Sequence, residues 1–574
     1  MFRFTKNYLL VGGFALLMAS SKQVNAQKTK DKEKDKQEQT PSQPKIGTGI
    51  PSGTTLFPTK NSDDDWHMAA QKLQQTLRIV NNQYMDEVDP KKASEDAIKG
   101  LLEELDPHSV YISAEEYQKV NEPLVGNFEG IGVSFNIIKD TIVVLNTIGG
   151  GPSEKVGIMA GDKIVKIEGD NVAGIKITND DVVKKLRGPK DTKVKVSMAR
   201  QGEKELLDFV IIRDKIPLYS VEAAYMATPT VGYIKLNRFA STSVEEVGSA
   251  IEKLQTQNMQ DLIFDLRGNG GGLLDASFKL SSMFFPEGRL IVYTEGRKSP
   301  RTDYQSVGEG IFRKGRLVVL IDEGSASASE IVSGAIQDWD RGLLIGRRSF
   351  GKGLVQRPFP LSDGSMIRLT VAHYYTPSGR CIQRPYDNGK DDYKKDLSKR
   401  YEDGELTGKK AEKEMPDSLK SYTLLKKRLV YGGGGVMPDI FVPIDTTLNY
   451  GFYNEMNRKN IINEFMLEYV NKNRSSLLLQ YPNIEKFKET YTISDQLIDQ
   501  LIETAKRDSV ENKEPEKFKE ALPTVKVLLK ALMARYLWDA EAYVKVVNDI
   551  NPVYLKALEA LKDDTFKKLK IGNE

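Results

Sequence analysis

The stretch Leu317–Gln356 constrains the fold of this chain most, because its pattern fits a strand, a helix and a second strand in succession. Leu317–Ile321 is a continuous apolar, β-branched run of the kind found in buried parallel strands. Apolar residues recur at helical spacing over residues 331–339, and Leu343–Ile345 is another short apolar run. Because parallel crossovers are almost always right-handed, both strands should end at one sheet edge, where sites in α/β folds lie.

That predicted edge carries three serines and one lysine. Ser325, Ser327 and Ser329 stand at the start of the helix, and Lys352 is the single lysine of the loop Arg347–Gly353. A serine hydroxyl needs a base within hydrogen-bond reach, and lysine can be that base only when it is neutral. Burial or a nearby cation must then lower its pKa from about 10.4 to roughly 7–8; the neighbours Phe350, Gly351 and Gly353 are uncharged and compact enough to allow burial, and Arg347 and Arg348 would lower the pKa further if they point inward. The residues predict a nucleophile and a base but leave the three serines open, since a serine-rich helix start is often only a cap.

A glycine-rich turn follows another predicted buried strand, Asp261–Leu266. The turn Arg267–Gly272 lacks the Gly-Lys-Ser/Thr ending of a Walker loop and the spacing of a dinucleotide fingerprint. Glycines at a strand end leave backbone N–H groups free. We therefore interpret the turn as an oxyanion site, with a second N–H group supplied by the residue after the nucleophile.

Composition narrows the function classes. The 83 basic and 80 acidic residues leave a net charge of +3, so nothing indicates a nucleic-acid partner. Cys381 is the single cysteine and can form neither an internal disulfide nor a cysteine-rich metal site. Only three histidines are present, which weighs against zinc catalysis, and we expect neither a metal nor a cofactor. His373 is the rival base, but it lies in the predicted strand Met366–Tyr375 without a clear acidic partner.

The two ends of the chain differ from its middle. Residues 1–26 have a basic start, a short apolar run and the ending Val24-Asn25-Ala26, which predicts a secretory signal peptide, with a retained membrane anchor as the alternative. We expect an exported protein, periplasmic or envelope-associated in a bacterium and soluble after cleavage. The other predicted parts are a disordered linker at 27–60, a helical region at 61–125, a core at 215–445 with an exposed charged insertion at 387–416, and a helical C-terminal domain at 446–574.

Residues 126–214 change to short strands and turns and resemble a PDZ domain. The loop Gly130-Ile131-Gly132-Val133 and the turn Ala160-Gly161-Asp162-Lys163-Ile164 carry the resemblance. In PDZ domains the N–H groups of this loop bind the C-terminal carboxylate of a peptide, which adds a strand beside the strand that follows the loop. The resemblance thus implies that Gly130, Ile131, Gly132 and Val133 bind peptide.

A wider resemblance covers Asp63 to Pro443. Ser325-Ala326-Ser327-Ala328-Ser329-Glu330, with Phe350-Gly351-Lys352-Gly353 and Gln356, resembles the active-site signature of the carboxyl-terminal processing (tail-specific) serine proteases. Four further motifs stand in the order of that family: Leu105-Asp106-Pro107-His108-Ser109-Val110-Tyr111, Asp265-Leu266-Arg267, Tyr375-Thr376-Pro377-Ser378-Gly379-Arg380 and Pro438-Asp439-Ile440.

The resemblance implies a fold and roles for particular residues. The expected fold is multidomain α+β, with a PDZ β-domain, an α/β (ClpP/crotonase-like) protease core and helical N-terminal and C-terminal regions. The implied residues are the nucleophile Ser327, the base Lys352, Gln356 to orient that base, and Ala328 with Gly270 or Gly271 as the oxyanion hole. Gly268 beside Asn269 departs from relatives, which often carry a polar residue and then a proline, so the oxyanion glycine stays open.

We therefore expect an exported serine endopeptidase that captures protein C-termini with its PDZ domain and cleaves through a Ser/Lys acyl-enzyme. Its partners would be tailed protein substrates, and the helical termini are candidates for forming a homo-oligomer. A non-catalytic binding protein on the same fold is one alternative, but it should lack the serine or the lysine. A crotonase-like acyl-transfer enzyme is another, but it would not explain the PDZ segment.

Overall fold

The computed structural model describes residues 62–409, 416–446 and 450–572, which fall into two compact units that divide at Leu101. The predicted signal peptide and linker, residues 1–60, lie outside the described residues. Within the described ranges, no helix is long and apolar enough to cross a membrane.

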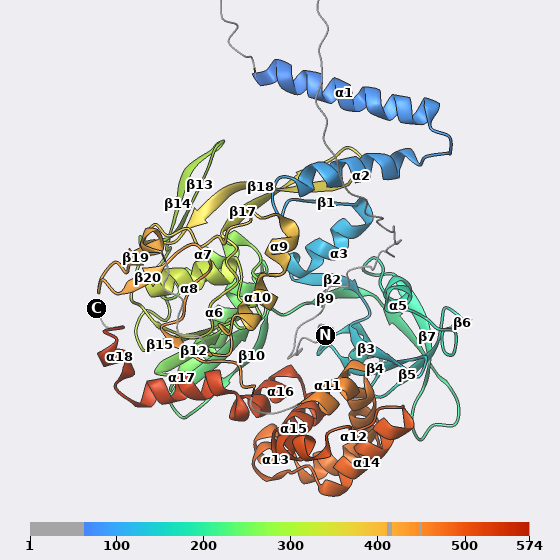
Figure 1. Cartoon of the computed structure of the whole chain (residues 1–574). Helices are drawn as coiled ribbons and strands as arrows, with labels where there is room; N and C mark the ends of the chain where they lie inside the picture. The colour runs from blue at the N-terminus through green and yellow to red at the C-terminus, as the bar shows by residue number, and fades with distance from the viewer. Residues whose placement is uncertain (1–61, 410–415, 447–449, 573–574) are drawn as a thin grey trace, which may run out of the picture. The chain divides into compact units, whose positions relative to one another are not determined.

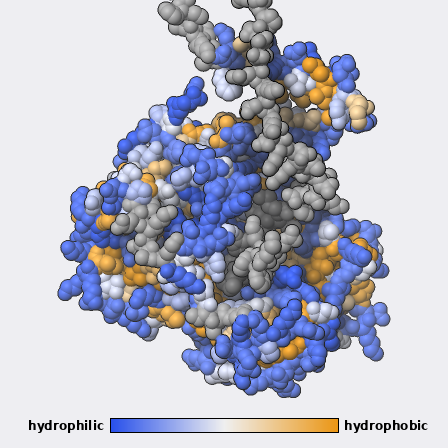
Figure 2. All heavy atoms as spheres, viewed as in Figure 1, coloured by the Kyte–Doolittle hydropathy of each residue, from blue (hydrophilic) through white to orange (hydrophobic). Residues whose placement is uncertain are grey.

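The smaller unit holds α1 (Ser62–Gln83) and most of α2 (Pro90–Glu103). Both helices lie in the predicted helical region. Large apolar side chains reach the surface of α1, among them Trp66, Leu73 and Ile79, whose exposed fractions are 72%, 50% and 54%. Figure 2 shows hydrophobic atoms on this helix. Surface of this kind often marks an interaction site.

The larger unit contains a six-stranded sheet that carries the predicted strand–helix–strand unit (Figure 1). In spatial order its strands are β10 (Val221–Met226), β11 (Val231–Leu236), β12 (Asp261–Asp265), β15 (Leu317–Ile321), β16 (Leu343–Gly346) and β21 (Ile440–Phe441). All neighbours are parallel except β10 and β11. The predicted strand–helix–strand unit is confirmed, since β15 pairs with β16 in parallel and α8 (Ala328–Asp338) lies between them in sequence.

Helices cover both faces of this sheet because its strands are apolar on both sides. On one face lie α6 (Ser243–Thr256), α7 (Leu274–Ser282) and α8. On the other lie α16 (Ala540–Val547), α17 (Pro552–Lys562) and α18 (Thr565–Lys568). The last helices of the chain therefore complete the core of the sheet, although the sequence grouped them with the C-terminal region.

The preceding C-terminal helices pack mainly on one another and form a second core. They are α11 (Gly451–Arg458), α12 (Ile461–Gln480), α13 (Ile484–Thr490), α14 (Asp495–Arg507) and α15 (Pro515–Leu537). This part of the chain is helical, as predicted.

A second sheet brings distant parts of the sequence to the serine–lysine edge. Its strands are β1 (Val110–Ile112), β18 (Met366–Tyr375), β13 (Leu290–Gly296), β14 (Ser299–Gln305) and β17 (Leu354–Pro360), which pairs with β18. Since β17 starts two residues after Lys352 and β1 pairs with the other side of β18, residues near His108 come close to the lysine loop.

Residues 127–217 form a separate small β-structure. Its main sheet has the strand order β3 (Val133–Ile138), β4 (Thr141–Thr147), β5 (Lys163–Ile167), β7 (Lys193–Ala199) and β8 (Leu207–Ile212), with β6 (Asp170–Asn171) beside β5. The helices are α4 (Pro152–Lys155) and α5 (Asn179–Leu186), and β2 (Asn127–Gly130) pairs with β9 (Asp214–Pro217). Within the described residues β3 pairs with β4 alone, so β3 is an edge strand.

The expectation of an exposed insertion at 387–416 is wrong for part of that segment. It contains α9 (Lys390–Lys394) and α10 (Asp396–Glu402), in which the side chains of Tyr393 and Arg400 are buried. Arg400 can be buried because Glu405 offsets its charge with an ion pair. The remaining elements are α3 (Ala114–Val125), β19 (Lys420–Tyr422), β20 (Leu429–Tyr431) and two short 3₁₀ helices, Asp417–Leu419 and Asn548–Ile550.

Candidate active site

Ser327 occupies the turn between β15 and α8. Its backbone dihedrals are φ 55° and ψ −110°, a conformation that L residues rarely adopt and that often marks functional sites. Ser327 is partly exposed, whereas Ser325 and Ser329 are fully buried. Their hydroxyls donate to the carbonyls of Leu266 and Asn269, each at 2.8 Å. Of the three serines that the sequence left open, Ser327 alone is accessible.

Lys352 is largely buried in the loop that follows β16. Burial lowers its pKa to about 8; the positive charge of Arg368 acts in the same direction, and the carboxylates of Glu330 and Asp106 oppose it. Its Nζ donates to Gln356 Oε1 at 3.2 Å. A lysine in this state is neutral in a useful fraction of molecules at mildly alkaline pH, as general-base chemistry requires.

The amide of Gln356 is fixed in turn by His108. Gln356 Nε2 donates to the carbonyl of His108, and the N–H of His108 donates to Asp106 Oδ1 at 2.8 Å. Burial, followed by the charge of Lys352, lowers the pKa of His108 to about 4, so its ring is neutral at physiological pH. The ring nitrogen Nε2 lies 2.9 Å from the hydroxyl of Tyr393.

Glu330 ties the serine turn to the lysine loop. One carboxylate oxygen accepts from the N–H groups of Ser327 at 2.8 Å and Lys352 at 2.9 Å. The other accepts from the N–H of Gly351 and the hydroxyl of Ser349, both at 2.6 Å. Full burial raises the pKa of Glu330 to about 7 even though these four donors favour the charged form. The role of Glu330 is not evident from its residue type, but its capping-box position three residues after Ser327 is a signal that the sequence contains.

Tyr374 supplies a second connection between the serine turn and the lysine loop, which the sequence pattern does not predict. Its buried hydroxyl lies 3.0 Å from the carbonyl oxygen of Ser327 and 2.5 Å from that of Lys352. Alternation along β18 predicted a half-buried strand but not this contact, because the three residues meet only in the folded chain. Glu330 and Tyr374 together fix the backbones of Ser327 and Lys352 relative to each other.

The glycine turn after β12 lies against Ser327. A Cβ added to Gly271 would stand 2.8 Å from Ser327 Cβ and 3.1 Å from the nitrogen of Ala328. The N–H of Gly271, however, donates to Asn269 Oδ1 at 2.9 Å. Gly270 is exposed, and within the described residues we find no acceptor for its N–H or for that of Ala328. Proximity thus favours Gly271 as an oxyanion donor, and a free N–H favours Gly270.

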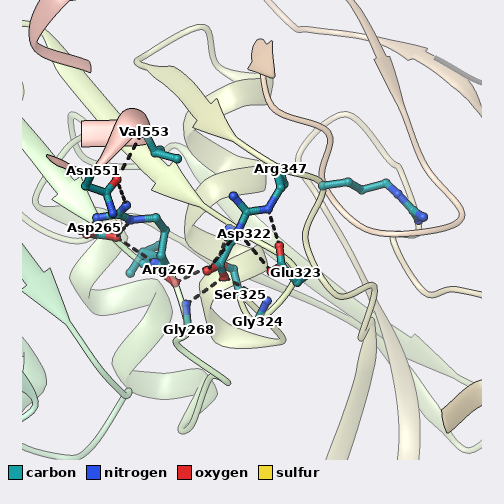
Figure 3. Close-up of polar contacts among 12 residues, drawn as sticks. Asp265, Arg267, Gly268, Asp322, Glu323, Gly324, Ser325, Arg347, Asn551 and Val553 are labelled. Carbon is teal, nitrogen blue, oxygen red and sulfur yellow. Dashed lines mark hydrogen bonds and ion pairs between the residues drawn. The ribbon is translucent and has the colours of Figure 1, made fainter. Parts of the chain in front are cut away.

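Polar contacts hold the start of this turn in place (Figure 3). Arg267 points from the end of β12 to Asp265, at 2.5 Å, and to Asn551 Oδ1. Asp322, at the end of β15, accepts the N–H of Gly268 at 2.8 Å. Because Asn551 also caps α17, the turn is tied to the C-terminal helix that covers the sheet.

His373, the rival base, does not join this cluster. Its ring nitrogen Nδ1 lies 3.8 Å from Cys381 Sγ, and within the described residues no hydrogen bond joins His373 to Ser327. In the same ranges we find no group of three or more histidine, cysteine or acidic residues arranged to hold a metal ion.

The predicted peptide-binding loop connects β2 to β3. Gly130 ends β2, Ile131 is buried, Gly132 has φ 76°, and Val133 begins the edge strand β3. The carbonyl of Ile131 accepts from both the N–H and the hydroxyl of Ser153, which fixes the loop. No acceptor is found in the described chain for the N–H groups of Ile131 and Gly132.

Comparison with known proteins identifies the family. Residues 230–390 match the model of peptidase family S41. A carboxy-terminal-processing protease of Bartonella bacilliformis is 37% identical over 332 residues, which cover 57% of this chain and 75% of the relative. The chain belongs to the carboxy-terminal processing proteases of family S41. It is a serine-type peptidase, and the predicted family and fold class are confirmed.

Other matches divide the protease into parts. Residues 9–116 match the N-terminal domain of the activating protease CtpB, residues 130–210 match the PDZ domain, and residues 452–539 match a family of unknown function. The carboxy-terminal processing protease CtpB of Bacillus subtilis is 32% identical over 338 residues, covering 58% of this protease and 70% of CtpB. A CtpA-like serine protease of Staphylococcus aureus is 34% identical over 315 residues, covering 54% of this protease and 62% of the relative.

One similar solved structure is a photosystem II D1 C-terminal processing protease, which is 32% identical to this protease. The matched region covers 55% of this protease and 83% of the solved chain, with a TM-score of 0.32. The PDZ domain of a carboxy-terminal protease from Vibrio cholerae, solved in complex with a peptide, is 31% identical and covers 16% of this protease and 99% of that domain, with a TM-score of 0.15. The family assignment rests on the sequence relatives.

Proposed function

We propose that the protease cleaves peptide bonds through a dyad of Ser327 and Lys352. The neutral Nζ of Lys352 takes the hydroxyl proton of Ser327 while Oγ attacks the scissile carbonyl. Two N–H groups, that of Ala328 and that of Gly270 or Gly271, hold the oxyanion of the tetrahedral intermediate. The C–N bond then breaks, and the Lys352 ammonium gives its proton to the leaving amine.

The second half of the reaction restores the serine. Lys352, neutral again, takes a proton from water, whose oxygen attacks the acyl-enzyme ester. The ester C–O bond breaks, the new C-terminus leaves as a carboxylic acid, and Ser327 Oγ recovers its proton from Lys352. Gln356 orients the lysine throughout, because its Oε1 accepts from Nζ.

One observation carries this proposal: an accessible serine in a strained turn shares Glu330 and Tyr374 with a buried lysine of lowered pKa. The alternative, a non-catalytic binding protein on the same fold, gives no reason for lowering the pKa of that lysine.

Labelling with a fluorophosphonate probe, together with cleavage of a tailed protein, tests the dyad. Ser327→Ala and Lys352→Ala should each abolish both reactions while binding of a C-terminal peptide survives. Ser325→Ala and Ser329→Ala are the matched controls and should keep labelling within about tenfold of wild type. Ser329→Ala loses one buried hydrogen bond, to the carbonyl of Asn269, and Ser325→Ala loses the bond that it donates to Leu266 and the one that it accepts from the N–H of Asp322. Full labelling of Lys352→Ala would exclude the lysine as base.

The PDZ domain in this proposal captures substrate tails. The free N–H groups of Ile131 and Gly132 suit a C-terminal carboxylate, and the edge strand β3 is open to an added strand. A peptide with a free C-terminus should bind the Ser327→Ala protein, and its C-terminally amidated form should bind at least tenfold more weakly. Equal binding of the two forms would argue against carboxylate capture.

Export and self-association complete the proposal. The pattern of residues 1–26 supports secretion, so the mature protein should start at Gln27 in a periplasmic or envelope fraction, and a mature protein that retains Met1 would contradict this.

The exposed apolar residues of α1 support a homo-oligomer. Leu73→Glu with Ile79→Glu should then lower the molar mass in light scattering, whereas Gln74→Glu should not; an unchanged mass would contradict that role for α1.

A further inference from the structure

The charged insertion packs on the loop that carries Lys352. The match to family S41 ends at residue 390, where α9 begins, so the family match assigns no role to this segment. The expectation of an exposed segment fails most clearly at Tyr393 and Arg400, whose side chains are 5% and 4% exposed.

Tyr393 contacts two residues near Lys352, His108 and Phe350. Its ring meets His108 edge-on, with centroids 5.3 Å apart, and its hydroxyl lies 2.9 Å from His108 Nε2. It also meets the ring of Phe350, two residues before Lys352, at 6.1 Å. The guanidinium of Arg384 lies 3.8 Å from the ring of Tyr393 and 4.0 Å from that of Phe350.

Arg400 holds the start of the same loop. Its guanidinium donates to the carbonyl of Arg348 at 2.7 Å and to that of Ser349 at 3.3 Å. Glu405 pairs with Arg400 at 2.9 Å and with Arg348 at 2.7 Å. The insertion therefore contacts backbone as well as side chains of the loop.

We propose that residues 390–405 are a clamp that positions Lys352, with Tyr393 and Arg400 as its positioning residues. Tyr393 fixes His108, whose carbonyl holds the Gln356 amide that orients Lys352. Arg400 fixes the backbone that leads into Gly351, a residue at φ 87°. A loop rich in glycine needs such support, since a misplacement of about 1 Å can slow a reaction roughly 10²-fold.

The inference rests on the proposed role of Lys352 and is tested on the full chain with the fluorophosphonate probe over a range of pH. Tyr393→Ala should lower the labelling rate about 10- to 100-fold. Tyr393→Phe loses the hydrogen bond between the hydroxyl and His108 Nε2 but keeps the ring contacts with His108, Phe350 and Arg384, and it should restore the labelling rate to within about threefold. Tyr401→Ala is the matched control because Tyr401 lies in the same insertion but is 51% exposed, and it should label like wild type.

The pH dependence of the labelling rate distinguishes a loss of Lys352 positioning from a loss of protein stability. The charged or titratable groups around Lys352 are Arg368 on β18, Glu330 on α8, and Asp106 and His108 before β1. Loosening the clamp should admit water to Lys352 and move the midpoint of the labelling profile of Tyr393→Ala to higher pH.

Two outcomes would overturn the clamp: an unchanged labelling rate in Tyr393→Ala, or a rate that falls only in proportion to the unfolded fraction, with the midpoint unmoved. Lys352→Ala keeps the two proposals apart. If that variant still labels, the dyad fails; if it does not label and Tyr393→Ala labels like wild type, the clamp alone fails.

Discussion

Replacing Glu330 with glutamine tests whether this carboxylate holds the serine turn and the lysine loop together. Glu330 is fully buried and accepts four hydrogen bonds, two at each oxygen. Glutamine has one accepting oxygen, and its NH₂ group would face two donors. Each buried donor left without an acceptor costs about 1–3 kcal/mol, so the lost contacts amount to roughly 2–6 kcal/mol.

A second term has the opposite sign. Burial raises the pKa of Glu330 from 4.5 to about 7, so the folded state binds this proton more tightly than the unfolded state. Glu330 thus contributes stability that is fully present below pH 4.5 and is lost as the pH rises to about 7. A tenfold change in affinity is about 1.4 kcal/mol, so the loss is roughly 3 kcal/mol. Glu330→Gln removes this loss, which offsets part of the cost of the unsatisfied donors above pH 7.

Activity should therefore fall further than stability. At pH 8 we expect the free energy of unfolding of Glu330→Gln to lie within about 3 kcal/mol of wild type, from the balance of these two terms. Cleavage of a tailed protein should drop about 10²-fold, because both loops lose an anchor. Urea unfolding at pH 4.5 and pH 8 supplies the stabilities, and Glu309→Gln, in an exposed ion pair, is the control. Cleavage within threefold of wild type, or an unchanged dependence of stability on pH, would refute the reasoning.

Three further predictions follow from the same site. The kcat/KM for a tailed protein should rise through about pH 8, since burial holds the pKa of Lys352 there and the base acts when neutral; a profile flat from pH 6 to 10 would contradict it. Gly271→Ala should abolish measurable cleavage, because the residue has φ 100° and its Cβ would stand 2.8 Å from the carbonyl oxygen of Ala326. Gly248→Ala is the control and should remain active, because its Cβ would make only an ordinary contact, 3.5 Å from Met283 Cε. Arg267→Ala should lower the free energy of unfolding by about 3–5 kcal/mol in chemical denaturation, since it leaves the buried Asp265 without its ion-pair partner. Arg301→Ala, in an exposed pair with Asp303, should cost less than about 1 kcal/mol.

The sequence by itself determined the strand–helix–strand unit around Ser327, the single lysine at its edge, the glycine turn and the family. These features are local, because apolar periodicity reports which face of an element is buried and motifs report the order of chemical groups. The residues alone left Ser325, Ser327 and Ser329 equivalent, and the resemblance selected Ser327.

Only the tertiary structure decided what surrounds that pair. Burial separates the accessible Ser327 from its two neighbours, and Glu330 and Tyr374 connect the serine turn to the lysine loop. The sequence likewise does not show that the insertion packs on the lysine loop or that α17 packs on the sheet. Periodicity shows that a face is buried but not which distant segment buries it, and a hydrogen bond between residues far apart in the chain depends on how the sheets are assembled.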